Sequence, residues 1–227
     1  MGKNVSKSSL AKANQDSVYH IFEEYAYYLV NEARKKRVSH IFKLGGNAYA
    51  FNSTTIDLCL SVFWRAKVRK KKGGIKVHTL YDVETPIPAF FHITEASVEV
   101  YKAMNEIPYE SGLYYIFDRG YNNFNMLYQI HLIGANFVVR AKKNLQYKSI
   151  KWKRRLPKNV LSDANVFLTG FYPKQYYPEP LRLIRYWDEE QGREFTFMTN
   201  ATHISALQVA ELYKNRWQFE LFFKCLK

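Results

Sequence analysis

The chain has only two cysteines, Cys59 and Cys225, among its 227 residues. Two cysteines are too few for a disulfide framework, so the composition indicates a reducing compartment. No apolar run approaches the roughly 18 residues that a membrane-spanning helix needs. Residues 1–14 are polar and lack the apolar core of a signal peptide. These absences predict a cytoplasmic protein with no membrane partner.

Other kinds of feature are also scarce. The six histidines are scattered without the spacing of zinc ligands, so no zinc site is expected. Glycine and proline number only 10 and 7, and the sequence has no internal repeat or low-complexity segment. Hydrophobic residues make up 47% of the chain and aromatic residues 17%. A chain of this length and composition can bury a real core in one large domain or two small ones.

Acidic residues are few relative to basic ones, 20 against 34, which leaves a formal net charge of +14. A soluble domain this basic commonly meets a polyanion, and nucleic acid is the commonest one. Residues 65–76 carry seven cations around a turn, and a second run follows at 147–155 with Tyr147 and Trp152 interleaved. Either run alone would also fit a solvated surface, whereas both together favour contact with phosphates. The candidate DNA-binding residues in these runs are Arg65, Lys67, Arg69, Lys70, Lys71, Lys72, Lys151, Lys153, Arg154 and Arg155.

The hydrophobic pattern predicts a helix, then a β-rich region, then alternating elements. Residues 1–14 are expected to fray, and apolar spacing predicts a helix over 16–37. Strands are expected at 48–56, 57–64, 75–83 and 87–94, with a turn at 70–74 and a helix at 95–106. The apolar run 112–117 reads as a strand buried on both faces, ending at Asp118. A helix at 122–133, a strand at 136–142 and strands near 164–171, 181–187 and 194–199 follow.

The last helix starts at a capping box, because Ser205 is followed three residues later by Gln208. It is expected to continue to the end of the chain. At 100° per residue, four polar residues fall within one stripe of about 60°. They are Tyr213, Arg216, Glu220 and Lys227. The stripe fits two interpretations: a surface network of i,i+4 ion pairs, or a carboxylate at the core edge that holds a metal beside phosphate-gripping cations.

These four residues have the spacing Tyr-x2-Arg-x3-Glu-x6-Lys, which resembles the signature of the DDE transposases encoded by one large group of bacterial insertion sequences. IFDRGYNNF (116–124) is similar to the second carboxylate motif of that family, and AFNSTTIDL (50–58) to the first. GGIKVHTLYDVETPIPAFFHIT (73–94) resembles the block between them. The resemblance extends from about residue 15 to the end of the chain.

The resemblance implies a fold and an activity. The fold would be an α/β, ribonuclease-H-like one with a mixed sheet, spanning residues 39–227 after an N-terminal helical segment, 1–38. A β-rich insertion at about 143–200 would precede the last helix. The activity would be metal-dependent DNA cleavage and strand transfer in cut-and-paste transposition.

The resemblance also assigns roles to residues. Asp118 and Glu220 would be the second and third carboxylates and would bind Mg²⁺, or Mn²⁺, in a two-metal site. Arg216 and Lys227 would hold phosphates near the cut, and Tyr213 would position the backbone or the helix. The partners would be double-stranded DNA, at element ends and target, and a second copy of the protein on paired ends. The setting would be the nucleoid of a bacterium.

Asn52 stands where the family carries its first catalytic aspartate. An amide supplies one neutral oxygen and no charge, so a two-metal site would lose its bridging ligand. Asp57 lies at an odd offset and would point to the opposite face of an unbroken strand, and Asp82 belongs to another strand. Neither is expected to substitute for the missing carboxylate.

Family members usually continue past the signature lysine and begin with a further DNA-binding region, so the chain is expected to be a fragment or a decayed copy. Three interpretations stay open. The first is a transposase by descent, impaired by Asn52 and by a truncated C-terminus. The second is a non-catalytic DNA-binding remnant. The third, an unrelated basic nucleic-acid-binding module, requires all three motifs to be accidental.

Overall fold

A computed structural model describes residues 6–16, 20–35, 44, 46–58, 67–68, 72–85 and 87–216. The chain divides into two compact units, Met1–Val38 and Ser39–Lys227. In the first unit, α1 spans Lys7–Asp16 and α2 spans His20–Lys35. α2 lies within the helix expected over 16–37, but α1 was expected to be frayed chain. The reason is that KSSLAKANQD is largely polar, so its sequence carries no apolar stripe.

The second unit is built on strands β1 to β10. Their bounds are Ala48–Leu58, Lys67–Val68, Lys72–Asp82, Ile87–Glu95, Tyr114–Phe117, Asn136–Arg140, Tyr147–Trp152, Val160–Leu168, Leu181–Asp188 and Arg193–Thr199. Among the described residues of this unit, three α-helices accompany them: α3 (Phe124–Leu132), α4 (Phe171–Tyr176) and α5 (Ala206–Asn215). Two 3₁₀ helices, η1 (Val100–Glu106) and η2 (Arg119–Tyr121), flank β5.

The strands form one mixed sheet in the order β2-β3-β1-β5-β6-β10-β9-β8-β7, with β4 paired to β3. β1, β5 and β6 are parallel neighbours at its centre. β3 and β4 extend one side as antiparallel strands, and β10, β9, β8 and β7 extend the other. Three antiparallel strands followed by parallel ones, in the order β4-β3-β1-β5-β6, are the arrangement of a ribonuclease-H-like domain. The expected α/β fold, with its β-rich insertion before the last helix, is confirmed.

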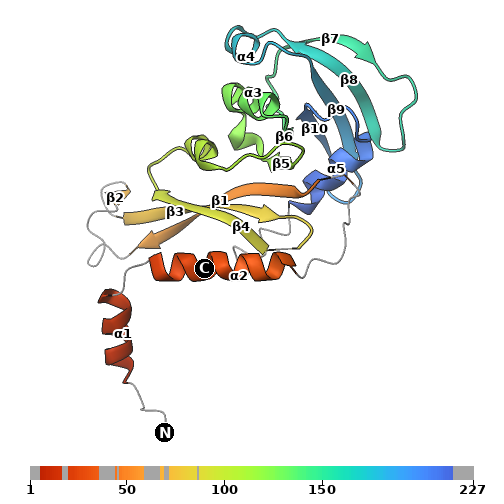
Figure 1. Cartoon of the computed structure of the whole chain (residues 1–227). Helices are drawn as coiled ribbons and strands as arrows, with labels where there is room; N and C mark the ends of the chain where they lie inside the picture. Colours follow the sequence, from red (N-terminus) through yellow and green to blue (C-terminus); the bar gives the residue numbers. More distant parts are fainter. Residues whose placement is uncertain are drawn as a thin grey trace. The chain divides into compact units, whose positions relative to one another are not determined.

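β5 is buried on both faces of this sheet, as its continuous apolar run predicts. Tyr115 and Phe117 belong to the core that includes residues of α3 and η1. Tyr114 and Ile116 belong to the core that includes residues of α5. α3 and α5 therefore cover opposite faces of the central strands (Figure 1). Successive side chains of a strand alternate between its two faces. On β5, even-numbered residues therefore face α5 and odd-numbered residues face α3.

Three expectations about the first half of this unit were wrong in detail. β1 continues past the break expected between strands 48–56 and 57–64, and it is paired with β3 from Tyr49↔Asp82 to Leu58↔Gly73 without interruption. Residues 59–64 of the second expected strand lie outside the described residues. The charged side chain of Asp57 is exposed to solvent, so β1 can continue through this residue. β3 starts inside the turn expected at 70–74. The helix expected at 95–106 is a turn followed by η1, where β-branched Val98 and Val100 disfavour an α-helix.

In the insertion, β8, β9 and β10 lie near the expected strands, whereas β7 and α4 were not expected. β7 pairs only with β8 among the described strands and is therefore an edge strand. Its sequence, YKSIKW, has the charged residues that edge strands use against unwanted pairing. Such a strand lacks the apolar alternation by which strands are recognised in sequence.

Phe137 on β6 provides a test of this core. Its side chain is 0% exposed, so Phe137→Ala should lower the free energy of unfolding by about 3–5 kcal/mol in urea titration. The matched control is Phe171→Ala on α4, where the side chain is 79% exposed. The control should change stability by less than about 0.5 kcal/mol. Equal losses in both variants would contradict the described core.

Candidate active site on β1 and at the end of β5

The parallel register of β1 and β5 aligns Asn52 with Asp118. The paired residues are Ala48↔Tyr114, Tyr49↔Tyr115 and Ala50↔Ile116. Continuing the same register by two residues brings position 52 beside position 118, and the backbone of Asp118 is still extended (φ −82°, ψ 173°). Neighbouring strands lie about 4.8 Å apart, so the continued register predicts that these two residues are adjacent. Both share the parity of Ala50 and Ile116 and therefore face α5.

Tyr213 on α5 joins this strand end directly. Its hydroxyl donates a hydrogen bond to Oδ1 of Asp118 over 2.7 Å. The Tyr213 side chain is 2% exposed, and its ring centroid lies 4.9 Å from that of Phe197. The phenol is therefore fixed by packing on β10 before it reaches the carboxylate. α5 begins at Ser205, where the expected capping box with Gln208 is formed.

The surroundings keep Asp118 ionised. Burial by itself would raise the pKa of this half-buried carboxyl. The hydrogen bond from Tyr213 and the positive charges of Arg216 and Arg140 outweigh that effect, so the pKa of Asp118 lies below its usual value. Burial, together with the nearby Asp118 charge, raises the pKa of Tyr213 to about 12, although Arg216 acts the other way. The pair is thus a neutral donor and a charged acceptor at neutral pH.

Two guanidinium groups surround the Asp118–Tyr213 pair. Arg216, the C-cap of α5, is 5% exposed, and its Cζ lies 5.2 Å from the centroid of the Tyr213 ring. Arg140 ends β6, and its Cζ lies 4.9 Å from the centroid of the Phe195 ring. Arg216 is buried rather than set on a solvated face. That burial disfavours the surface ion-pair interpretation of the helix stripe at this position.

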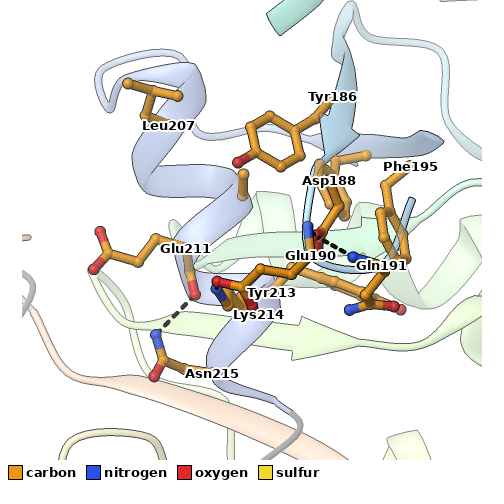
Figure 2. Close-up of a pocket in the computed structure, with 12 residues that line it drawn as sticks. Tyr186, Asp188, Glu190, Gln191, Phe195, Leu207, Glu211, Tyr213, Lys214 and Asn215 are labelled. Atoms are coloured by element: carbon orange, nitrogen blue, oxygen red, sulfur yellow. Dashed lines mark hydrogen bonds and ion pairs between the residues drawn. The ribbon is translucent and has the colours of Figure 1, made fainter. Parts of the chain in front are cut away.

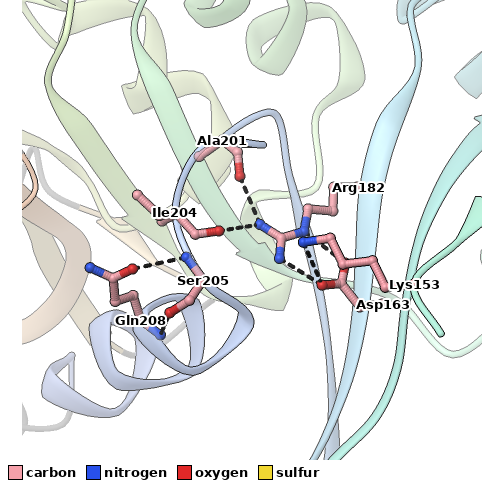
Figure 3. Close-up of polar contacts among 7 residues, drawn as sticks. All are labelled: Lys153, Asp163, Arg182, Ala201, Ile204, Ser205 and Gln208. Carbon is pink, nitrogen blue, oxygen red and sulfur yellow. Dashed lines mark hydrogen bonds and ion pairs between the residues drawn. The ribbon is translucent and has the colours of Figure 1, made fainter. Parts of the chain in front are cut away.

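A buried ion pair fixes the start of α5 (Figure 3). Arg182 on β9 is 1% exposed and binds both carboxylate oxygens of Asp163 on β8, each over 2.7 Å. Its Nη1 also donates to the carbonyls of Ala201 and Ile204, immediately before the helix. Lys153 reaches Asp163 Oδ2 from the exposed side, over 3.0 Å. The β-rich insertion therefore holds the N-terminal end of α5, the helix whose Tyr213 contacts Asp118.

A groove of about 680 Å³ lies on the outer side of Tyr213, between α5 and the β9–β10 hairpin (Figure 2). Asp188, Glu190 and Glu211 line it against a single cation, Lys214. Lys214 Nζ lies 2.5 Å from Glu190 Oε1, so that cation is already paired. The groove therefore presents excess negative charge next to the site.

The remaining candidate ligands stand apart from Asp118. Asp57 has the opposite parity to Asn52 on an unbroken strand, and its side chain is exposed. Asp82 pairs with Tyr49, and its Oδ1 accepts the backbone N–H groups of Glu84 and Thr85 in the turn after β3. Neither aspartate replaces the carboxylate absent at position 52.

Several predicted site residues lie outside the described residues. They are Glu220, Lys227, Arg65, Arg69, Lys70 and Lys71. Lys67 lies in β2 and Lys72 begins β3. Lys151, Lys153, Arg154 and Arg155 are exposed on β7 and the loop after it. DNA contact by any of these residues stays a prediction.

Among the described residues, no group of three histidine, cysteine or acidic side chains could hold a metal ion. Asp118 is the one carboxylate that the strand register places beside Asn52, and Asn52 Oδ1 accepts the N–H of Ser53 over 2.9 Å. The chemistry of this donor set fits a hard cation only if a further carboxylate joins it.

None of the described helices is long and apolar enough to span a membrane.

Sequence reasoning missed Arg140 and the Arg182–Asp163 pair. Arg140 could have been found, because it ends the strand beside Asp118's strand, and the carboxyl ends of parallel strands meet at one edge. Arg182 stands among apolar residues in LRLIRYW, and a buried cation needs a partner. Nothing in the sequence identifies Asp163 as that partner.

Sheet order and strand register together define a ribonuclease-H-like domain with a carboxylate at the end of β5. Residues 43–227 match the model of the family described as Transposase DDE domain. The chain therefore belongs to the Transposase DDE domain family.

Two curated relatives agree with this family. The chain is 34% identical over 181 residues to a protein of Sinorhizobium fredii named as the transposase y4zB, a match that covers 78% of this chain and 50% of the relative. It is 24% identical over 176 residues to a protein of Geobacillus stearothermophilus named as a transposase for insertion sequence element IS5377, covering 78% and 46%. The chain thus spans about half the length of these relatives.

Among solved structures, a piggyBac transposase synaptic complex with hairpin DNA is similar, with a TM-score of 0.45 and 14% sequence identity. That match covers 75% of this chain and 38% of the piggyBac chain.

Tyr213→Phe tests the link between α5 and Asp118. Without the phenol proton, the pKa of Asp118 should rise, which ¹³C NMR of the labelled carboxyl can follow. The hydrogen bond favours the ionised carboxyl, so its contribution to stability is present above the unfolded pKa of about 4 and is lost as pH falls through the folded pKa. At neutral pH the variant should lose about 1.5–3 kcal/mol of unfolding free energy.

The control for that variant is Tyr186→Phe, which removes a phenol from the outer groove without touching Asp118. It should leave the Asp118 titration unchanged. A Tyr213→Phe titration that coincides with the wild-type curve would rule out the described hydrogen bond as the cause.

Arg182→Met should lower the free energy of unfolding by about 3–5 kcal/mol, because it removes the buried guanidinium from two carbonyls and from Asp163, which then keeps only Lys153 as a partner. Arg185→Met is the matched control on the same strand. Arg185 also binds a carboxylate through two nitrogens, that of Glu194, but both side chains are partly exposed. The control should cost about 1 kcal/mol or less in the same denaturant titration. Similar losses in the two variants would show that the buried pair does not anchor α5.

Proposed function

We propose that residues 39–227 form the catalytic domain of an insertion-sequence transposase, a metal-dependent enzyme that cleaves DNA and transfers strands by cut-and-paste transposition. The reaction is phosphoryl transfer between a DNA phosphate and a hydroxyl nucleophile. The partners are double-stranded DNA, at element ends and target, and a second copy of the chain on paired ends. The setting is the cytoplasm of a bacterium, on the nucleoid.

The observation that carries this proposal is the ionised Asp118 at the end of a central parallel strand. Asp118 faces α5 and, by the continued strand register, is expected beside position 52 of β1. Ligands in open α/β sheets collect at the carboxyl ends of parallel strands. A carboxylate whose pKa is lowered there stays available to a cation at neutral pH.

Asp118 and Glu220 are the residues that would hold Mg²⁺ or Mn²⁺, with Asn52 adding at most one neutral oxygen. A bound divalent cation would polarise the phosphate and stabilise the attacking and leaving oxygens. Tyr213 holds Asp118 in place through its hydroxyl, and Arg216 adds positive charge beside the carboxylate. Arg216 and Lys227 serve phosphates near the cut.

Asn52 is expected to weaken catalysis in this copy. Its amide oxygen is neutral and already accepts the Ser53 N–H, so it competes poorly for a cation. This observation favours a second candidate function, a DNA-binding transposase remnant that grips element ends without cutting them.

Asn52→Asp decides between the two functions. The change restores a carboxylate beside Asp118 at nearly equal volume. Mn²⁺ affinity, measured by calorimetry at pH 7, should rise about tenfold or more, because a third carboxylate joins those of Asp118 and Glu220. Nicking of the DNA that flanks this reading frame should then appear in Mn²⁺, and it should be absent in the unmodified chain.

Two controls accompany that variant. Asp57→Asn removes a carboxylate of the opposite face of the same strand and should leave Mn²⁺ affinity unchanged. Glu220→Gln in the Asn52→Asp background should abolish both the added metal affinity and the nicking. Metal-dependent cleavage by the unmodified chain, lost in Glu220→Gln, would show that Asn52 is tolerated. Unchanged Mn²⁺ affinity in Asn52→Asp would refute the metal site and leave the DNA-binding remnant.

A further inference from the structure

A second cavity, of about 720 Å³, lies beyond the carboxyl ends of β5 and β6, toward the β9–β10 hairpin of the insertion. None of the basic residues that line it belongs to the two cationic runs recognised in the sequence. Its twelve lining residues include six cations: Arg119, Arg140, Lys142, Lys143, Arg185 and Arg193. We refer to these six side chains as the basic cleft.

The charge of the basic cleft is poorly neutralised. Glu194 is the one carboxylate among its lining residues. Glu194 is paired with Arg185, whose Nε and Nη2 lie 2.6 and 2.8 Å from the two carboxylate oxygens. Within the described part of the chain, no salt bridge joins a carboxylate to Lys142, Lys143 or Arg193. A cavity with such an excess of positive charge attracts anions.

Two of its guanidinium groups also have buried donors that are not used. The Nε atoms of Arg119 and Arg193 are buried and have no hydrogen-bond partner among the described residues. A buried donor without a partner costs free energy, about 1–3 kcal/mol, which a ligand oxygen would recover. Arg193 is held in place by the Phe195 ring, 4.6 Å from its Cζ, so its donors are pre-positioned.

The position of the basic cleft connects it with Asp118. Arg119 follows Asp118 in the chain, and Arg140 lowers the pKa of Asp118 by its charge. The outer groove beside Tyr213 has the opposite character, with three carboxylates against one paired cation. A polyanion that reaches Asp118 is therefore attracted from the side of β6 and repelled from the side of α5 and the β9–β10 turn.

We propose that the basic cleft binds backbone phosphates of the DNA strand that enters the Asp118 site. This inference rests on the proposed function for its substrate, DNA. The insertion contributes Arg193 to the cleft, and the segments that follow β5 and β6 contribute Arg119 and Lys142, so the DNA strand would be held between the two parts of the sheet. The contacts are to phosphates and are independent of base sequence.

Salt-dependent binding tests the proposal directly. The probe is a fluorescein-labelled single-stranded oligonucleotide of random sequence, followed by anisotropy from low to moderate salt with the full chain. For a double variant, Lys142→Gln with Lys143→Gln, the slope of log affinity against log salt should decrease by about 0.7 for each cation removed. Affinity at low salt should fall roughly tenfold or more. Both lysines are exposed, so this variant should fold normally.

Arg193→Gln is the second variant, and it should also weaken binding and reduce the slope. Lys174→Gln is the matched control, because Lys174 is an exposed cation on α4, outside the basic cleft. Its slope of log affinity against log salt should match that of the wild type within about a third of a unit for the one charge removed. If the cleft variants and the control lose affinity equally, the charge acts only through the protein's overall field, and the proposal is overturned.

Inorganic phosphate separates a DNA site from a small-anion site. At constant ionic strength, added phosphate should leave oligonucleotide binding to the wild type unchanged, because several contacts hold the strand at once. Displacement of the oligonucleotide by phosphate at constant ionic strength would overturn the proposal in favour of a small-anion site.

The outcome is independent of the test of catalysis. Asn52→Asp reports on metal binding, and the lysine variants report on DNA binding without metal. Loss of DNA binding in the cleft variants supports the basic cleft even if Asn52→Asp gains no metal affinity. Unchanged DNA binding refutes it even if metal affinity rises.

Discussion

The hydrogen bond from Tyr213 to Asp118 joins the last described helix to the centre of the sheet, and the arrangement of the site depends on it. Asp118 is half-buried, and burial alone would favour its neutral form. A carboxyl in that form would be a poor ligand for a cation. The phenol, with the nearby guanidinium charges, reverses this effect and keeps the group charged. Ring packing against β10 positions the donor, so the electrostatics of the carboxylate depend on the core of the protein.

The rest of the sheet serves this contact. Parallel pairing of β1 with β5 fixes which residue stands beside Asp118, and residue parity fixes which helix both of them face. The insertion holds the start of α5 through Arg182 and forms one wall of the basic cleft through Arg193. The β-rich segment therefore contributes both to the placement of the helix and to the charge around the site.

Much of this could be predicted from sequence, for reasons that differ between elements. β5 was recognised because four consecutive buried residues leave a continuous apolar run. The start of α5 was recognised because a capping box is local. β7 and α1 were not recognised, because their polar sequences carry no apolar period. The Arg182–Asp163 pair and the basic cleft were beyond the reach of sequence, since their members come together only when distant strands pair.

The buried anchor at the start of α5 has a mechanical consequence for the phenol further along the helix. Arg182 binds the carbonyls of Ala201 and Ile204 just before the N-cap Ser205, whereas Tyr213 lies eight residues after Ser205, about 12 Å along the axis at 1.5 Å per residue. α5 therefore connects its anchor in the insertion to the phenol at Asp118, which ring packing on β10 also holds. A tilt of about 5° at that anchor would displace the phenol by about 1 Å, a misplacement large enough to cost an active site much of its rate. A rearrangement of the β-rich insertion at Arg182 would in this way displace the phenol that holds Asp118.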